Sequence, residues 1–173
     1  MKIFLDTADT QEIIRAQILG LMDGVTTNPT LIRKSGNNPI DVYSAIADLG
    51  VPDISMEVYG GLDEMHTEAL KLSERFGDVA TIKLPMTKEG LIVCQDLAKR
   101  KIRTNITLVF SIPQAILAAK SGATYVSPFV GRLDDQQVAG LEVVRGISSL
   151  YQIKGVETRV LAASIRSVQR AVR

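Results

Sequence analysis

Short apolar runs alternate with longer amphipathic segments along the whole chain. The runs are rich in β-branched residues and have the length of strands, so they are predicted to form β-structure. They cover residues 2–6, 24–28, 54–59, 79–84, 104–110, 124–129 and 158–163. Because helix-like segments separate them, the pattern predicts βαβ units, a parallel sheet and hence an α/β fold.

The segments between the runs carry helix signals. Asp9 followed by Glu12 resembles a capping box. Beyond it, Ile14, Ile18 and Leu21 share one face of the predicted helix, as is typical of a face that packs on a core.

Three further helix signals follow. Asn38 and Pro39 read as an N-cap and a first helical position. The stretch from about residue 135 to 151 is predicted to form one helix. A last helix is expected to begin near Ser167, and the chain ends inside it.

Two architectures fit this alternation: an open, doubly wound sheet, or a (β/α)8 TIM barrel that lacks its last βα unit. No G-x-G-x-x-G motif follows the first strand, so the dinucleotide-binding form of the open sheet has no support. No linker, low-complexity tract or composition shift divides the chain, so residues 1–173 are expected to form one domain.

Lys83 stands out because it lies inside an apolar strand. Alternation places Val79, Thr81 and Lys83 on one face of that strand, and both faces of a parallel strand are covered. Burial disfavours the ammonium, and a neutral lysine amine can form a Schiff base with a carbonyl substrate. The alternative is a lysine at a strand end that reaches solvent or pairs with an acid.

Nearly every predicted strand carries a polar or ionisable residue near its C-terminal end. These residues are Asp6, Thr26, Asn28, Glu57, Asn105, Thr107, Ser127 and Ser164. Active sites of barrels and of open parallel sheets lie at this end. Each residue alone could be a cap or a turn former, but so many at one end predict a functional site.

Two arginines suggest the kind of substrate. Arg132 follows the sixth predicted strand, and Ser164 and Arg166 follow the seventh. An arginine fork, a hydroxyl and the amides of a helix N-terminus together suit a phosphate group. The alternative is that both arginines form surface ion pairs.

Composition narrows the function classes. Of 173 residues, 46% are hydrophobic and 23% are charged, and 20 basic against 19 acidic residues leave a net charge of +1. No strong field would therefore attract nucleic acid or an anionic membrane. The single cysteine, Cys94, and the single histidine, His66, disfavour a disulfide or a zinc site. We expect Cys94 in the core and His66 on the surface.

The lengths of the apolar runs bear on the cellular location of the protein. The N-terminal run is too short, and interrupted too early by Asp6, for a signal peptide. No run has the length needed to cross a bilayer. A cytoplasmic location is therefore expected.

Several motifs resemble one family. They are FLDT at 4–7, GVTTNPT at 24–30, IKLP at 82–85, TKEG at 87–90, TNIT at 104–107, YVSPFVGR at 125–132 and VLAAS at 160–164. In this order and number they resemble the small transaldolases and fructose-6-phosphate aldolases. The resemblance implies a (β/α)8 barrel with no metal or organic cofactor, sugar-phosphate substrates, and a homo-oligomer that is often a pentamer or a decamer.

The same resemblance implies roles for single residues. Lys83 matches the Schiff-base lysine, Asp6 matches the acid–base aspartate, and Glu57 with Thr107 would position a water. The substrate-binding residues implied by the resemblance or by the strand-end pattern are Thr26, Asn28, Asn105, Ser127, Phe129, Arg132, Ser164 and Arg166.

Two positions separate the subgroups of this family. At Glu57 and Phe129 this chain resembles the transaldolases, which carry glutamate and phenylalanine there, whereas the aldolase subgroup carries glutamine and tyrosine. Asn105 also fits the transaldolase pattern. The expected reaction moves a dihydroxyacetone unit from sedoheptulose 7-phosphate to glyceraldehyde 3-phosphate, a step of the pentose phosphate pathway. The alternatives are a fructose-6-phosphate aldolase and an inactive barrel remnant that binds sugar phosphates.

Overall fold

A computed structural model describes residues 1–167 of the chain. The strands are β1 (Phe4–Asp6), β2 (Gly24–Thr26), β3 (Ile54–Glu57), β4 (Ala80–Pro85), β5 (Thr104–Val109), β6 (Tyr125–Pro128) and β7 (Arg159–Val160). The helices are α1 (Thr10–Ile18), α2 (Pro29–Ser35), α3 (Pro39–Asp48), α4 (Leu62–Phe76), α5 (Lys88–Lys99), α6 (Ile112–Lys120), α7 (Val130–Asp135) and α8 (Gly140–Lys154), with a short 3-10 turn η1 (Gly77–Val79). All the predicted strands are confirmed, most of them shorter than expected. The helix predicted near Ser167 lies outside the described residues.

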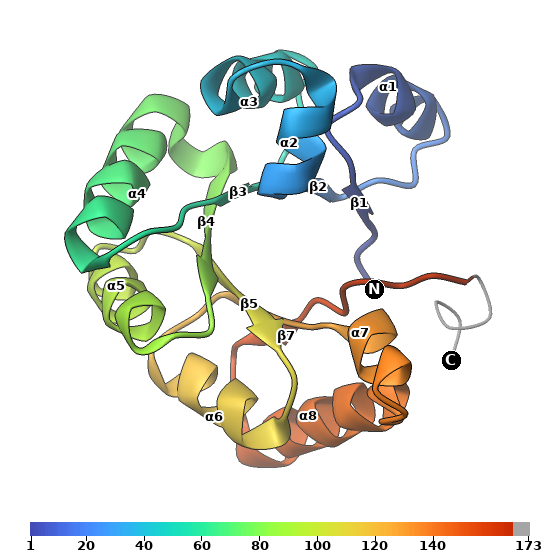
Figure 1. Cartoon of the computed structure of the whole chain (residues 1–173), viewed down its shortest axis with the longest axis vertical. Coiled ribbons are helices and arrows are strands. Elements are labelled where there is room, and N and C mark those ends of the chain that lie inside the picture. The colour runs from blue at the N-terminus through green and yellow to red at the C-terminus, as the bar shows by residue number, and fades with distance from the viewer. Residues whose placement is uncertain (168–173) are drawn as a thin grey trace.

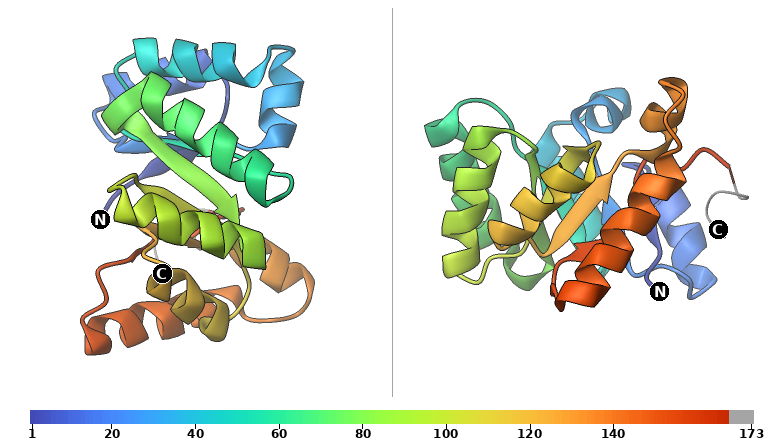
Figure 2. Two further views of the ribbon diagram at one scale, coloured as in Figure 1. Left: turned by 90° about the vertical axis from the view of Figure 1, so that its left-hand side faces the viewer. Right: turned by 90° about the horizontal axis from the view of Figure 1, so that it is seen from below.

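The strands form one parallel sheet in which neighbours follow chain order from β1 to β7. A doubly wound sheet reverses its order at a switch point, and no reversal occurs here. The sheet curls, and the helices lie around its outer face (Figure 1). Figure 2 shows the same outer layer of helices from two other sides. This is the winding of a TIM-barrel-like fold, and the absence of a last βα unit from this chain stays a prediction.

The core lies between the sheet and the helices. Outward side chains such as Met56, Ile82 and Leu84 are fully buried and belong to one cluster with Met65 and Leu72 of α4. Alternation turns the other residues of β4, among them Lys83, toward the inside of the curl. The sheet therefore uses one face for packing and reserves the other for polar groups.

Helix α1 packs differently from the prediction. Ile13 is its buried residue, whereas Ile18 and Leu21 are 80% and 60% exposed. The helix has nine residues and ends at Ile18, so only one turn of it faces the core and Leu21 lies beyond its end. The expected capping box is also wrong, because the carboxylate of Glu12 accepts a hydrogen bond from Thr7 instead of from the backbone at Asp9.

Two other helices differ from expectation. Helix α2 was not predicted, and Asn28, which was expected at the end of the second strand, is its N-cap. The helix predicted over residues 135–151 is α8, which begins later, at Gly140. Helix α7, which was not predicted, ends at Asp135, and Gln137 lies between the two helices with a φ of 60°. Asn38 caps α3 as predicted, with its side chain accepting from the N–H of Asp41.

Candidate active site at the C-terminal ends of the strands

Strand register brings three of the predicted site residues to one level. Glu57 on β3 is the register partner of Lys83 on β4, and Lys83 is the partner of Asn105 on β5. All three side chains are polar, in strands whose other residues are mostly apolar. The sheet thus places a carboxylate, an amine and an amide side by side.

Lys83 is held by two acceptors. Its Nζ donates to the carbonyl oxygen of Thr27 at 2.8 Å and lies 2.8 Å from Oε2 of Glu57. The side chains of Lys83 and Glu57 are 6% and 15% exposed. The lysine therefore does not reach solvent, and its amine is paired with an acid in a largely buried site.

A polar chain runs across the inside of the sheet beside Lys83. Asn105 donates from Nδ2 to Oγ of Ser55 at 3.2 Å and accepts at Oδ1 from Oγ of Ser127 at 2.8 Å. All three residues are buried. These bonds fix the orientation of the amide and leave its second N–H for a ligand.

Thr107 has a buried hydroxyl without a hydrogen-bond partner among the described residues. Its side chain is inside the curl at 1% exposure, and the next residue, Leu108, has a φ of 61°. The register of β5 against β6 shifts at this point, as in a β-bulge. Bulges often re-aim side chains next to active sites, and an orphaned buried hydroxyl is costly unless a water or a ligand contacts it.

Asp6 and Thr26 are register partners at the ends of β1 and β2. Oδ1 of Asp6 accepts a hydrogen bond from Oγ1 of Thr26 at 2.9 Å, and Asp6 is exposed. The threonine thus orients a carboxylate that solvent and ligands can reach. Asn28 has a capping role that was not predicted, since its Oδ1 accepts from the N–H groups of Thr30 and Leu31.

The predicted phosphate residues separate into two kinds. Arg132 is exposed, lies 5.1 Å above the ring of Phe129, and has no acidic partner among the described residues. Arg166 instead forms a 2.7 Å ion pair with Asp135. The alternative that these arginines form surface ion pairs is therefore correct for Arg166, whereas Arg132 forms no such pair in the described part of the chain. The ring of Phe129 also makes an edge contact with Phe110, with 6.0 Å between the ring centroids.

Ser164 is tied closely to the start of α7. The N–H of Gly131 donates to the carbonyl of Ser164 at 3.0 Å, and the N–H of Val130 donates to that of Ala163 at 3.0 Å. These amides of α7 are therefore not free for a phosphate, and the helix expected near Ser167 lies outside the described residues. Gly131 is required here, because a Cβ would lie 2.5 Å from the Ser164 carbonyl oxygen.

Sequence reasoning missed Thr27, Ser55 and Gly131. Thr27 acts through its backbone carbonyl, for which the residue type carries no signal. Ser55 lies in β3, and Thr27 directly follows β2. Both residues are 0% exposed, and the sequence did not indicate that they would be completely buried. Only Gly131 carried a signal, since glycine is the residue that allows the backbone to approach another segment closely.

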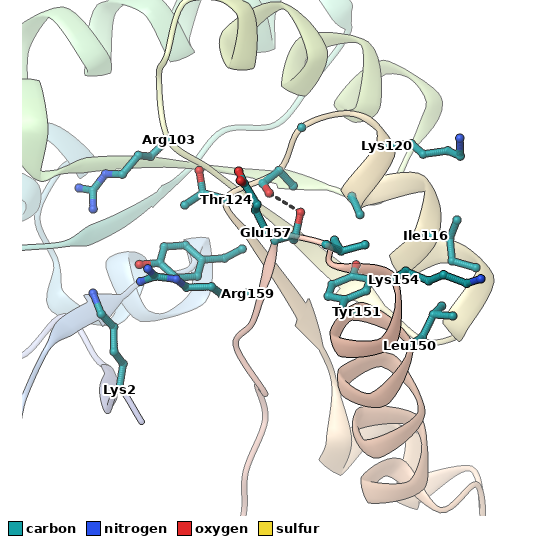
Figure 3. Close-up of a pocket in the computed structure, with 16 residues that line it drawn as sticks. Lys2, Arg103, Ile116, Lys120, Thr124, Leu150, Tyr151, Lys154, Glu157 and Arg159 are labelled. Atoms are coloured by element: carbon teal, nitrogen blue, oxygen red, sulfur yellow. Dashed lines mark hydrogen bonds between the residues drawn. The ribbon is translucent and has the colours of Figure 1, made fainter.

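The opposite end of the sheet is built from another buried network. Asp53 is 2% exposed and accepts from Thr81 at 2.7 Å, Arg103 at 2.7 Å and Tyr125 at 2.9 Å. Beside it lies a cavity of about 1200 Å³. Figure 3 shows Lys2, Arg103 and Arg159 around one part of it. Lys83 does not line this cavity, so the cavity is separate from the candidate active site.

Cys94 and His66 have structural roles. Cys94 is fully buried as predicted, and its sulfur lies 3.3 Å from Oγ1 of Thr104. His66 is not simply solvated, because its Nε2 lies 2.8 Å from Oδ2 of Asp96 on α5. This bond and the guanidinium of Arg100 hold the pKa of Asp96 below its ordinary value. In residues 1–167, no helix has the length and apolar character to cross a membrane.

Comparison with known proteins points to one family. A family model described as transaldolase/fructose-6-phosphate aldolase matches residues 3–172. A probable transaldolase of Flavobacterium psychrophilum is 48% identical over 99% of this chain and 81% of its own length. Probable transaldolases of Caulobacter vibrioides and of Caulobacter sp. strain K31 are 48% and 50% identical, over 77% of their own lengths. The chain therefore belongs to the transaldolase/fructose-6-phosphate aldolase family.

Proposed function

We propose that this protein is a transaldolase of the pentose phosphate pathway, which transfers a dihydroxyacetone unit from sedoheptulose 7-phosphate to glyceraldehyde 3-phosphate. The observation that carries the proposal is the environment of Lys83: a buried amine between the carbonyl of Thr27 and the carboxylate of Glu57. A buried lysine beside a proton acceptor suits Schiff-base chemistry with a ketose.

The first step is attack of the Lys83 amine on the C2 carbonyl of the donor. The ammonium must first lose a proton, and the carboxylate of Glu57 at 2.8 Å is placed to accept it. The resulting carbinolamine loses water to give an iminium. Glu57 and the orphaned hydroxyl of Thr107 are suited to hold the water that carries protons in this dehydration.

Cleavage of the carbon chain needs a base near the C4 hydroxyl. Asp6 takes that proton while the C3–C4 bond breaks, and the bond's electron pair enters the iminium to give an enamine on Lys83. Erythrose 4-phosphate leaves. The enamine then attacks the aldehyde of glyceraldehyde 3-phosphate, and Asp6 returns its proton to the oxygen of that aldehyde, which becomes the new C4 hydroxyl. Hydrolysis of the new iminium releases fructose 6-phosphate and frees the amine of Lys83. The hydrogen bond from Thr26 orients Asp6 for this transfer.

Substrate binding falls to the polar residues around this centre. The free N–H of Asn105 suits a donor hydroxyl, and its bond to Ser127 keeps it in place. Arg132 is the cation best suited to the phosphate, because it is exposed and no acid neutralises it in the described part of the chain. Asn28, Phe129 and Ser164 line the same end, and Arg166 contributes less because Asp135 holds it.

Transfer is favoured over simple aldol cleavage by Glu57 and Phe129. A phenylalanine at 129 brings no hydroxyl that could protonate the enamine and release free dihydroxyacetone. An edge contact with Phe110 and a cation–π contact with Arg132 hold the ring in place. The location we propose is the cytoplasm. We also propose a homo-oligomer, which the exposed side chains of Ile18 and Leu19 would favour.

Borohydride trapping tests the proposal. The protein is incubated with fructose 6-phosphate and sodium borohydride, which reduces an iminium to a stable amine, and the labelled peptide is identified by mass spectrometry. We expect label on Lys83 alone, and none in Lys83→Met. Label on another lysine would contradict the assignment. Binding of sugar phosphate with neither label nor turnover would favour the inactive remnant.

A further inference from the structure

The cavity at the N-terminal end of the sheet carries a one-sided charge. Its volume is about 1200 Å³, and pockets of about 300–1000 Å³ already hold most small ligands. Within the described part of the chain, five cationic side chains line it against the one carboxylate of Glu157. The cations are Lys2, Arg103, Lys120, Lys154 and Arg159. The whole chain has 20 basic and 19 acidic residues, so this excess of positive charge is local.

Two of these cations are explained without a ligand. Lys120 and Lys154 are the last residues of α6 and α8, where a cation stabilises the negative end of the helix dipole. The other three come from the N-terminal ends of β1, β5 and β7, where no helix dipole accounts for them. We call these three residues the cation cluster: Lys2, Arg103 and Arg159.

Tyr125 on β6 connects the members of the cation cluster. It is the register partner of Arg159 on β7. Its hydroxyl donates to Oδ2 of Asp53 at 2.9 Å, and the same oxygen accepts from Nη1 of Arg103 at 2.7 Å. Lys2 lines a second, smaller cavity of about 370 Å³ together with Tyr125 and Arg159. The sheet therefore gathers cations from three strands around one buried tyrosine.

The cation cluster keeps both charge and donors for a ligand. Nη1 of Arg103 donates to Asp53, and Nη2 donates to the carbonyl of Asp78. A guanidinium has five N–H groups, so this arginine is fixed in place with donors left over. Lys2 and Arg159 are exposed and have no ion-pair partner among residues 1–167. Two uncompensated charges beside a fixed guanidinium suit a group with several negative charges, such as a diphosphate.

The other side of the cavity is apolar. Ile116 of α6 and Leu150 and Tyr151 of α8 line it, and Figure 3 shows them across the cavity from the cation cluster. Ile116 is 37% exposed, so its side chain is accessible to a ligand. An apolar wall of this kind suits a flat, weakly polar ring such as a nucleobase. Thr124 and Glu157 lie between the two sides in Figure 3 and are suited to hydrogen bonds with the hydroxyls of a sugar.

We propose that this cavity binds a nucleoside diphosphate, whose phosphates contact the cation cluster and whose base packs against Ile116 and Leu150. The cavity lies at the opposite end of the sheet from the candidate active site, and Lys83 does not line it. The inference therefore goes beyond the proposed function and does not depend on it. A ligand in this cavity binds without competing with the sugar phosphates.

Calorimetric titration of the full chain tests the proposal, with ADP, pyrophosphate and adenosine as probes and no divalent cation present. ADP carries both parts of the proposed ligand, pyrophosphate carries only the phosphates, and adenosine carries only the nucleoside. We expect ADP to bind most tightly, pyrophosphate about tenfold more weakly, and adenosine without measurable affinity. Absence of ADP binding would overturn the proposal. Equal affinities for ADP and pyrophosphate would overturn the assignment of a nucleotide.

Two matched pairs of variants locate the bound ADP. Arg159→Ala removes a cation of the cavity, and Arg145→Ala removes a cation of α8 outside it. We expect the first to raise the Kd of ADP and of pyrophosphate about tenfold, and the second to leave both nearly unchanged. Ile116→Ala should raise the Kd of ADP about threefold to tenfold and spare pyrophosphate, whereas its neighbour in Leu117→Ala, outside the cavity, should spare both. All four side chains are exposed, so these variants are expected to fold.

Arg132→Ala separates the cavity from the active site, because Arg132 is the residue proposed to bind the sugar phosphate. An unchanged Kd of ADP in this variant supports the cavity. A rise as large as that in Arg159→Ala would place ADP at the active site and overturn the inference. Equal losses in Arg159→Ala and Arg145→Ala would indicate diffuse attraction to surface cations, which would overturn it as well.

Discussion

The carboxylate of Glu57 and the amine of Lys83 are register partners on adjacent strands and lie 2.8 Å apart. We expect the stability of the protein to depend on both residues of this pair. In Lys83→Met the carboxylate stays largely buried without a cation, so stability should fall by about 3–5 kcal/mol. The double variant Lys83→Met/Glu57→Gln should regain most of that loss, and both proteins should be inactive. Urea unfolding curves measure this. A double variant no more stable than the single one would contradict the account.

Arg132→Ala should weaken the binding of phosphorylated donors. A charge-assisted arginine–phosphate contact contributes about 1.5–3 kcal/mol, so KM for fructose 6-phosphate should rise about 10- to 100-fold. Free dihydroxyacetone as donor should be handled almost as in wild type. Arg166→Ala is the control, and its effect should be smaller because Asp135 already holds that arginine. Equal losses for both donors would exclude Arg132 as the phosphate ligand.

Phe129→Tyr should change the fate of the enamine. The new hydroxyl at the C-terminal end of β6 could help to protonate the enamine, which would release free dihydroxyacetone. We expect more cleavage of fructose 6-phosphate to free dihydroxyacetone and less transfer. Product partitioning with and without erythrose 4-phosphate measures both routes. If the wild type already releases mostly free dihydroxyacetone, the transferase proposal is wrong and the aldolase alternative replaces it. An unchanged partition in the variant refutes only the role of Phe129.

Gly131→Ala should disturb the join between α7 and the segment after β7. The added Cβ would lie 2.5 Å from the carbonyl oxygen of Ser164 and 2.7 Å from Nε of Arg166. Overpacking of this kind costs about 1–3 kcal/mol, and KM for phosphorylated donors should rise as Ser164 moves. In Gly61→Ala the Cβ meets only Glu64 at 3.7 Å, so this control should be near wild type in both thermal unfolding and KM.

Two buried tyrosines predict how stability changes at high pH. Burial raises the pKa of Tyr43 and of Tyr151 to about 12. A raised pKa means that the folded protein holds these protons more tightly than the unfolded chain. Stability is therefore complete below the ordinary tyrosine pKa of about 10 and falls as the pH rises toward 12. Unfolding midpoints measured from pH 9 to 11.5 should fall less steeply in Tyr43→Phe/Tyr151→Phe. Parallel curves would contradict the prediction.

The strands and the central lysine were predictable for one reason. Lys83 is a charged residue in a run whose neighbours alternate between the two faces of a strand, so the pattern allowed either burial or a lysine at the strand end that reaches solvent. The polar residues at the ends of the other strands favoured burial. The ends of the strands carried Asp6, Glu57 and Asn105, and parallel pairing brings such ends together. The family resemblance then added roles that the pattern left open.

The remaining features depend on tertiary contacts. Thr27 contacts Nζ of Lys83 through its backbone carbonyl, and a backbone contact leaves no periodic signal in the sequence. Ile18 was expected inside, but helix α1 ends there and only Ile13 faces the core. Arg166 follows β7 as expected, yet its partner Asp135 is 31 residues away, a pairing that sequence spacing does not reveal.

The chain-order sheet also bears on how the protein comes to fold. Among the described strands, each one from β2 onward pairs with the strand synthesised just before it, so none of these pairings must wait for a distant part of the chain. Closing short loops costs less entropy than closing long ones, and contacts between near neighbours in sequence speed folding. Assembly can therefore proceed vectorially during translation. We expect the Glu57–Lys83 pair to form when the fourth strand docks, before Arg132 emerges, so the proposed nucleophile would be in place before the residue proposed to bind phosphate.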